Sequence, residues 1–291
     1  MNLKPKIMLA LAASLLSAAA LAEPLDLRRE VAPDATVTVV NIAGEINIST
    51  WDRNEVHLTG HTGDNSELEI SENEQGIRFE VRELRRKGRM GASVLTLVIP
   101  ATANISAESV SADITVAGSR AGRITAESVS GDLVIEGETG WADLSSVSGD
   151  IEFRGAATRN AIETVSGNID VAGVSGEVAL STVSGDAVLA ATLLTHGTFE
   201  TVSGTLELSL QVQDGGRLSV EAMSGDVTVA LPANQTGEFR AQSFSGQIRT
   251  GFGAVEHGGM GPGSHLHHVV GNSGTMIRVE SFSGDIHISR N

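Results

Sequence analysis

One short phrase, Ser-Val-Ser-Gly-Asp with close variants, returns nine times between residues 109 and 285. Its second serine falls at positions 111, 130, 148, 166, 184, 203, 224, 245 and 283. The first seven intervals are 18 to 21 residues long and the last is 38. A fixed period of this size is typical of solenoids, in which each repeat forms one coil and completes its core against its neighbours. This repeat constrains the fold more than any other feature of the chain.

Each repeat has the pattern of two short strands joined through a corner. Between Arg123 and Gly137, apolar residues alternate at Ile124 and Ala126 and again at Leu133 and Ile135. The Ser, Gly and Asp residues between the two runs favour a tight turn, and helix signals are almost absent beyond residue 22. We predict an all-β, single-stranded β-solenoid with coils of about 18–21 residues, whose strands pair with the next coil about 4.8 Å away.

We interpret the second position of each phrase as an inward column that forms the core. A buried side chain of this size stabilises a fold by roughly 1.5 to 3 kcal/mol before chain entropy is subtracted. The column enlarges toward the C-terminus: Val110, Val129, Val147, Val165, Val183, Val202, Met223, Phe244 and Phe282.

The first 22 residues have the layout of a secretory signal peptide. Lys4 and Lys6 precede an apolar run from Ile7 to Leu16, and Ala20-Leu21-Ala22 is a small-x-small cleavage site. The alternative, a membrane anchor, needs about 20 apolar residues without such an exit. We expect cleavage after Ala22, a mature chain without a transmembrane segment, and a periplasmic or extracellular location.

Two regions follow this segment. We interpret residues 23–100 as an irregular N-terminal β cap continuous with the solenoid, in which Glu67–Ile70 and Ile77–Arg82 form an antiparallel hairpin around Glu72–Gly76. A separate domain is the alternative, but no Pro- or Ser-rich linker follows. Residues 101–291 are the repeats, with a Gly/His-rich insertion near 251–274 that is either a loop or a degenerate coil.

The charge balance excludes one class of partner. Without residues 1–22 the chain has 18 basic and 36 acidic side chains, a net charge of −18. Such a chain repels the phosphates of nucleic acid. The chain has no cysteine, so neither a disulfide framework nor a lipidation site is present. Aromatic residues are only 3% of the chain, which counts against a lectin with aromatic platforms.

The repeats, the Trp51-Asp52 turn after NIAGEINI (41–48) and the LTLVIP strand (95–100) together support a resemblance. The chain resembles the bacterial β-strand-repeat family of unknown function named "putative adhesin", over about residues 35–290. The resemblance implies an exported or envelope-associated β-solenoid, with some relatives linked to envelope stress. It implies no catalytic residues. The Gly/His-rich insertion departs from the repeat pattern.

Stacked coils also place the last position of each phrase in one column. Its members are Asp113, Asp132, Asp150, Asn168, Asp186, Thr205, Asp226, Gln247 and Asp285. Closely spaced carboxylates could hold a ladder of divalent cations. Alternatively, each aspartate simply closes its turn in a solvated corner. The uncharged members and the absence of the calcium-binding nonapeptide favour the second interpretation.

Two other clusters are candidate sites. The basic cluster contains Arg82, Arg85, Arg86, Lys87 and Arg89, and it is either a contact for anionic lipid or an acidic partner, or a solvated loop tip. His265, His267 and His268 are weak candidates for Zn²⁺ or Cu²⁺ ligands. Flexible Gly/His-rich loops are the commoner case, so we predict no metal and no cofactor.

Recurrence argues against catalysis. A catalytic residue is needed once, whereas the Ser and Asp of the phrase recur in every coil, and no G-x-S-x-G motif is present. We therefore predict a non-enzymatic binding or adhesion-type protein of the cell envelope with an unidentified envelope or protein partner. The alternatives are a structural or envelope-stress component without a small ligand and, third, a polysaccharide-acting β-helix enzyme.

Overall fold

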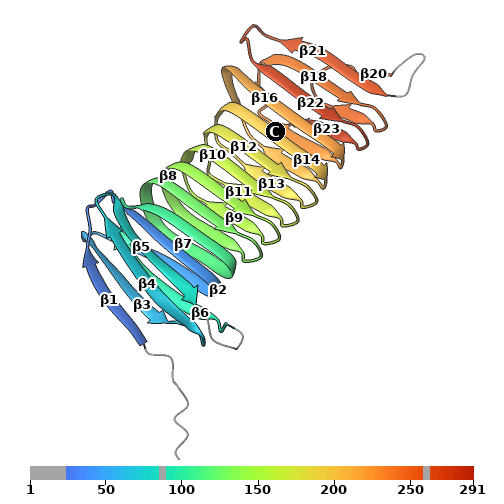
Figure 1. The fold of residues 1–291 in the computed structure, drawn as a ribbon. Helices are drawn as coiled ribbons and strands as arrows, with labels where there is room; N and C mark the ends of the chain where they lie inside the picture. The colour runs from blue at the N-terminus through green and yellow to red at the C-terminus, as the bar shows by residue number, and fades with distance from the viewer. Residues whose placement is uncertain (1–23, 85–89, 258–262) are drawn as a thin grey trace, which may run out of the picture.

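The computed structural model describes residues 24–84, 90–257 and 263–291. They form an elongated stack of β-coils, without a helix in these ranges (Figure 1). In the same ranges no helix is long and apolar enough to cross a membrane. The predicted signal peptide lies outside the described residues.

Each central coil has a longer strand and a shorter strand that face each other across the core. The longest strands continue around the corners and belong to more than one coil: β2 (Thr36–Trp51), β7 (Asn104–Ser128) and β8 (Leu133–Ser146). The following coils alternate separate strands: β9 (Ile151–Arg154), β10 (Ala157–Thr164), β11 (Ile169–Ala172), β12 (Gly176–Thr182), β13 (Ala187–Ala190), β14 (Leu194–Ser203), β15 (Leu206–Ser209), β16 (Val212–Ser224) and β17 (Val227–Leu231).

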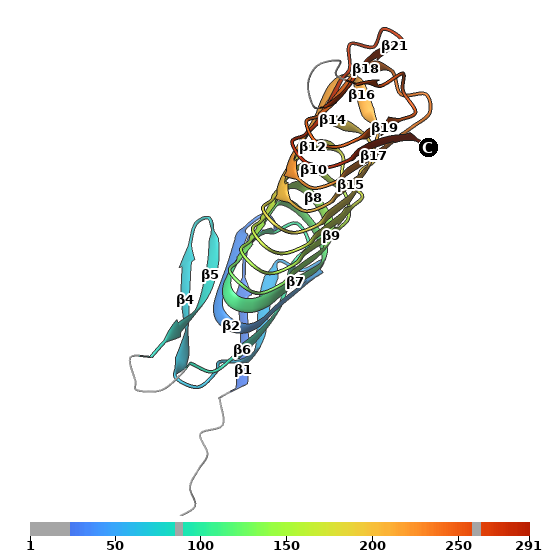
Figure 2. The ribbon, with the colours of Figure 1, turned by 90° about the vertical axis from the view of Figure 1, so that its right-hand side faces the viewer.

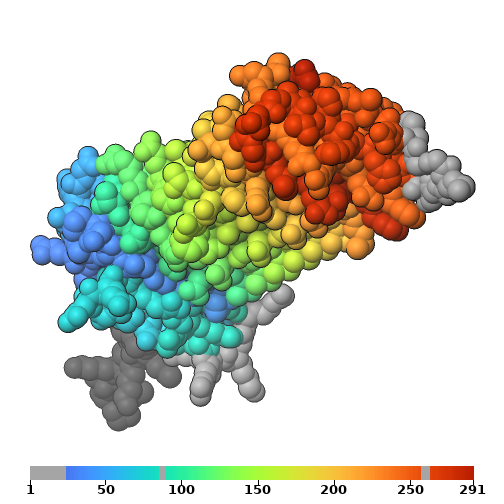
Figure 3. Space-filling view, turned by 90° about the horizontal axis from the view of Figure 1, so that it is seen from above, coloured from blue at the N-terminus to red at the C-terminus, as the bar shows by residue number. Residues whose placement is uncertain are grey.

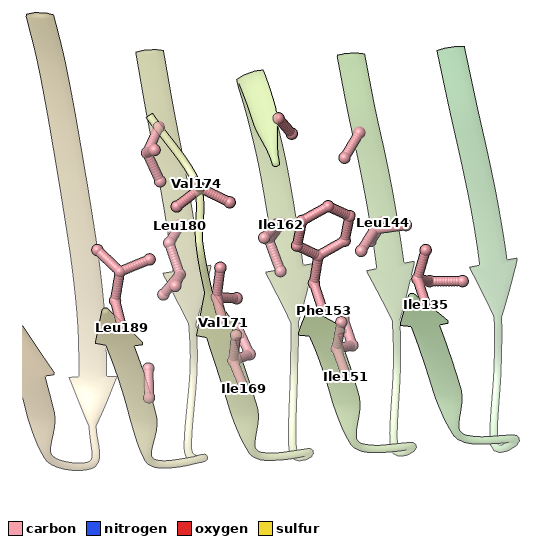
Figure 4. Close-up of a cluster of buried hydrophobic side chains, with 14 of the residues drawn as sticks. Ile135, Leu144, Ile151, Phe153, Ile162, Ile169, Val171, Val174, Leu180 and Leu189 are labelled. Atoms are coloured by element: carbon pink, nitrogen blue, oxygen red, sulfur yellow. The ribbon is translucent and has the colours of Figure 1, made fainter. Parts of the chain in front are cut away.

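Successive coils pair in parallel, one period apart. In the longer-strand row, Ile162 of β10 lies opposite Leu144 of β8 on one side and Leu180 of β12 on the other. In the shorter-strand row, Val171 lies between Phe153 and Leu189. Side chains from the two rows meet between the strands and form one continuous core (Figure 4). The predicted all-β fold and the period of the repeat are therefore confirmed.

The order of coils departs from the order of the chain at the C-terminal end. The last coil, β22 (Met276–Ser281) and β23 (Ile286–Arg290), lies between the coil of β16 and β17 and the coil of β18 (Gly237–Ser243) and β19 (Ile248–Thr250). In the space-filling view its red atoms lie among orange ones (Figure 3). A simple sequential winding is thus wrong here.

The insertion near 251–274 closes this end. Its described part contains β20 (Glu256–His257) and β21 (Ser264–Val270), and β21 runs antiparallel to β18. It is therefore neither an unstructured loop throughout nor a coil of the stack.

The N-terminal end uses the same arrangement. The coil of β2 lies between β7 and the strands β5 (Gly76–Glu83) and β6 (Ser93–Pro100). Antiparallel strands then cover the outer coil: β4 (Ser66–Asn73) on β5, β3 (Glu55–His61) on β6, and β1 (Pro24–Glu30) on β3. The β4–β5 hairpin confirms the predicted hairpin and stands beside the stack (Figure 2). Antiparallel additions at both ends interrupt the parallel pairing that could otherwise continue into another molecule.

The predicted inward column is wrong, because all nine of its side chains face solvent. Val129, Val147 and Val165 are 44–45% exposed, and Met223 and Phe282 are 60% exposed. The inward phase instead runs through Ile124, Ala126 and the hydroxyl residue Ser128, so the following valine points outward. The buried Ser128 accepts a hydrogen bond at Oγ from the amide N–H of Gly131 over 2.8 Å, which satisfies a polar group inside the corner.

Backbone spacing explains the glycine of the phrase. A Cβ on Gly149 would lie 2.0 Å from the carbonyl oxygen of Gly131, and one on Gly167 would lie 1.9 Å from that of Gly149. Neither glycine has a positive φ. The requirement is therefore space between stacked corners, not conformational freedom.

We expect Gly149→Ala to lower the free energy of unfolding by about 1–3 kcal/mol, because the added methyl group must push two coils apart. Gly122→Ala is the matched control, since its Cβ meets only the side chain of Asn104, at 3.2 Å. Thermal unfolding followed by circular dichroism measures both. Equal melting temperatures for the two variants would contradict this account of the corner.

The outward phase of the valines gives a second expectation. Val147→Asp should change the free energy of unfolding by no more than about 0.5 kcal/mol, as for other surface positions. Ile162→Asp should cost about 3–5 kcal/mol, because it places an unpaired charge among the two rows of strands. Chemical denaturation of both variants tests the assignment. A strong loss of stability in Val147→Asp would restore the inward interpretation.

Candidate binding surface

The corner side chains form a continuous row on the outside of the stack, which we call the apolar stripe. Because of the inserted coil, its spatial order ends with Met223, Phe282 and Phe244. The Phe244 and Phe282 rings stack with centroids 5.0 Å apart and planes 6° apart. The stripe consists, in spatial order, of Val110, Val129, Val147, Val165, Val183, Val202, Met223, Phe282 and Phe244.

Backbone hydrogen bonds between corners hold the stripe in register. The amide N–H of Ser148 donates to the carbonyl of Val129 over 2.9 Å, and that of Ser166 donates to Val147 over 3.0 Å. The same pattern links Ser283 to Met223 over 2.9 Å and Ser245 to Phe282 over 3.0 Å across the inserted coil. Neighbouring stripe side chains therefore follow the strand spacing of about 4.8 Å.

On one side of the stripe, the aspartate column bonds the backbone of the next coil. Oδ1 of Asp132 accepts from the amide N–H of Asp150 over 2.9 Å, and Oδ1 of Asp150 accepts from Asn168 over 2.7 Å. Asn168 continues the ladder to the amide of Asp186. The described part of the chain contains no group of three His, Asp or Glu side chains that could hold a metal ion. This geometry supports the turn interpretation of the aspartates, extended from one coil to the next.

A second row of carboxylates flanks the other side of the stripe, two residues before each stripe position. Pairing between the longer strands sets Glu200 beside Glu221, and Glu221 beside Glu280. Further along the row, uncharged residues such as Ser145 and Ser181 alternate with glutamates. The glutamates of this row are Glu108, Glu127, Glu163, Glu200, Glu221 and Glu280.

The stripe opens into a groove near the C-terminal end. The groove has a volume of about 1090 Å³ and spans five adjacent coils. Its apolar lining comprises Val183, Val202, Met223, Phe244 and Phe282, and its acidic lining comprises Glu200, Glu221 and Glu280. Sequence reasoning found the stripe residues but placed them in the core. The sequence did contain a signal for the outward direction. The alternation of inward residues continues through the Ser or Thr before the stripe position, so the next residue must point outward.

The basic cluster falls mostly outside the described residues, which exclude Arg85, Arg86, Lys87 and Arg89. Its described member, Arg82, forms ion pairs with Glu69 and Glu80 on the β4–β5 hairpin. Hydrogen bonds from Arg82 and Arg78 lower the pKa of the Glu80 carboxyl. Arg82 is thus engaged with acidic neighbours of its own chain.

The three candidate histidine ligands do not share a face. His265 and His267 are exposed on one side of β21, whereas His268 lies on the other side by the alternation of the strand. Nε2 of His267 lies 2.9 Å from Oε1 of Glu238. Hydrogen bonds from Arg240 and His267 lower the pKa of that carboxyl. Glu238, Arg240 and His267 thus form a polar cluster on the surface.

The aspartate ladder predicts a contrast between two substitutions. Asp150→Ala should lower the free energy of unfolding by about 1 kcal/mol, because the amide of Asn168 loses its acceptor. Asp150→Asn should be nearly neutral, since an asparagine already serves in the ladder at position 168. Melting curves with and without Ca²⁺ test both variants. A calcium-dependent rise in the melting temperature that Asp150→Asn abolishes would support the cation ladder instead.

Comparisons with known proteins give a family but no activity. No curated protein matches the chain. Among solved structures, a "putative lipid binding protein" from Parabacteroides distasonis matches with 12% identity, covering 91% of this chain and 96% of that chain, with a TM-score of 0.38. A "putative adhesin" from Parabacteroides merdae matches with 10% identity, the same coverages and a TM-score of 0.36. A "putative cell adhesion protein" from Clostridium sporogenes matches with 11% identity, 92% and 100% coverage, and a TM-score of 0.22.

The family comparison agrees with the resemblance inferred from the repeats. A family model described as Toastrack DUF4097 matches residues 37–289, which is most of the sequence. The chain therefore belongs to the Toastrack family, DUF4097.

Proposed function

We propose that this protein is an exported, non-catalytic binding module of the cell envelope, built as a single-stranded β-solenoid that uses its apolar stripe as the contact surface. The observation that carries the proposal is the exposure of nine large apolar side chains in one row. Contiguous exposed apolar patches are uncommon on soluble monomers, and they mark interaction sites more often than scattered apolar residues do.

The stripe contributes little to the core of the stack. The corner is held by the buried hydroxyl, the glycine and the aspartate, whose bonds do not involve the valine side chain. A polar residue would fit the same outward position without exposing apolar surface to water. All nine phrases nevertheless have an apolar residue at this position. This favours a partner that covers the row, and it counts against a purely structural or stress-response role without a ligand.

The net charge and the N-terminal segment restrict which surfaces the protein can bind and where it is located. A chain with 36 acidic and 20 basic side chains repels nucleic acid and anionic surfaces over about 10 Å at 0.1 M salt. The secretory layout of residues 1–22 supports a periplasmic or extracellular location. An envelope component with exposed apolar surface fits both properties.

Co-sedimentation with an isolated envelope fraction tests this function. The triple variant V165S/V183S/V202S should lower the bound fraction about tenfold, which corresponds to about 1.4 kcal/mol of binding free energy. The matched control V188S/L193S/V269S removes three exposed apolar side chains outside the stripe and should bind like the parent protein.

Two results would contradict the proposal. If R85A/R86A/K87A abolishes retention while the stripe variant does not, the basic cluster is the contact. If the parent protein is not retained at all, the structural alternative gains. Circular dichroism confirms that each variant has kept its β structure.

A further inference from the structure

The groove at the C-terminal end of the apolar stripe has a shape and charge that specify one class of partner. This inference rests on the proposed binding function and names the chemistry of the partner. The row of Val183, Val202, Met223, Phe282 and Phe244 lies on five adjacent coils. At about 4.8 Å per coil, the row is about 19 Å long.

The repeat distance of the row matches a helix better than a strand. Apolar residues at i, i+3, i+4 and i+7 recur along a helix about every 5.2 Å, from a rise of about 1.5 Å per residue. Side chains on one face of an extended strand recur about every 6.8 Å. A helix lying along the stripe can therefore place one apolar side chain per coil, and about 13 residues cover the groove.

Each border of the row has carboxylates at three of its five positions, and the other positions are uncharged: Ser181 and Gln242 on one side, Thr205 and Gln247 on the other. Glu200 and Glu221 are adjacent on one side, and neither forms an ion pair within the described ranges. Glu280 continues the row and pairs with Arg278 at 2.8 Å. On the other side, Asp186, Asp226 and Asp285 each use Oδ1 for a backbone amide of the next coil. Each of these aspartates keeps its second carboxylate oxygen outside that bond.

Other occupants fit less well. A second copy of the chain, docked stripe to stripe, would bring like carboxylate rows together, which opposes association. An anionic lipid surface meets the same repulsion. A helix with an apolar face bordered by lysine or arginine complements the apolar row and both carboxylate rows.

We propose that the groove binds a cationic amphipathic helix, with its apolar face on the stripe and its basic residues against the two carboxylate rows. The partner is a polypeptide segment of about four helical turns, set by the length of the row. Exposed ion pairs contribute mainly to specificity and association rate, and the apolar contacts supply most of the affinity.

Fluorescence anisotropy with a labelled 14-residue peptide of leucine and lysine, arranged with one apolar face, tests the proposal. The parent protein should bind it, and binding should weaken as salt rises. A peptide of the same composition reordered to remove the apolar face, and one with glutamate in place of lysine, should bind at least about tenfold more weakly.

Protein variants locate the contact. M223S/F244S/F282S should weaken binding at least about tenfold, whereas V188S/L193S/V269S should not. E200Q/E221Q should weaken binding and flatten its salt dependence. The matched control E136Q/E207Q removes two exposed carboxylates from the shorter-strand face and should leave both nearly unchanged. The glutamine variants keep the apolar corners intact, so they remain informative if the triple serine variant fails to fold.

Several outcomes would overturn the proposal. Equal binding of the reordered peptide would show attraction by charge alone, and equal effects of E200Q/E221Q and E136Q/E207Q would move the contact away from the groove. Stripe-dependent binding to uncharged phosphatidylcholine vesicles without peptide binding would make the occupant a lipid surface. If the envelope assay depends on the stripe but the peptide does not bind, the function stands and the helix is wrong. If the peptide binds through the stripe but the protein does not bind the envelope fraction, the helix-binding groove stands and the envelope function is wrong.

Discussion

The close approach of stacked backbones at the corner is the constraint on which the rest of the structure depends. A Cβ on Gly149 would lie only 2.0 Å from the carbonyl oxygen of Gly131 in the preceding coil, which is too close for two non-bonded atoms. A side chain at this position would push the coils apart, and eight of the nine phrases have glycine there, the exception being Ala112 in the first phrase. Because the corners can stack, each strand keeps its parallel partner and the core continues from coil to coil without a gap.

The corner also decides which side chains meet water. In eight of the nine phrases the residue before the stripe position is a Ser or Thr, the exception being Ala222. At most corners its hydroxyl accepts a hydrogen bond from the amide three residues later, as Thr164 does from Gly167 over 3.1 Å. The next residue must then point outward, and it is apolar in every repeat. A geometry needed for stacking thus aligns one exposed apolar side chain per coil. Any partner that covers one coil can therefore continue along its neighbours.

The two ends of the stack differ from its middle because a terminal coil has no further coil to pair with. A parallel coil at the end exposes unpaired backbone groups that can pair with another molecule. At the C-terminal end the chain leaves a gap of one coil between β16 and β18, and it adds the antiparallel strand β21 on the outer side of β18. It then returns, and the coil of β22 and β23 fills the gap. The return also brings Phe282 beside Phe244. The widest and most apolar part of the stripe is thus a product of the closure.

The repeat alone was sufficient to predict an all-β stack with its period, its two strands per coil and the Ser-Gly-Asp corner. Period-2 alternation and the steric needs of glycine are local properties, so they can be read from one unit. The inward prediction for Val129 is wrong because an apolar residue beside a turn can continue either strand phase. The alternation through Ile124, Ala126 and Ser128 favours the outward direction, and the packed coil shows that Ser128 occupies the inward place. The adjacency of Glu221 and Glu280, 59 residues apart in the chain, depends on the inserted coil. Strand order at the ends is decided by edge pairing between distant segments, which tertiary structure alone determines.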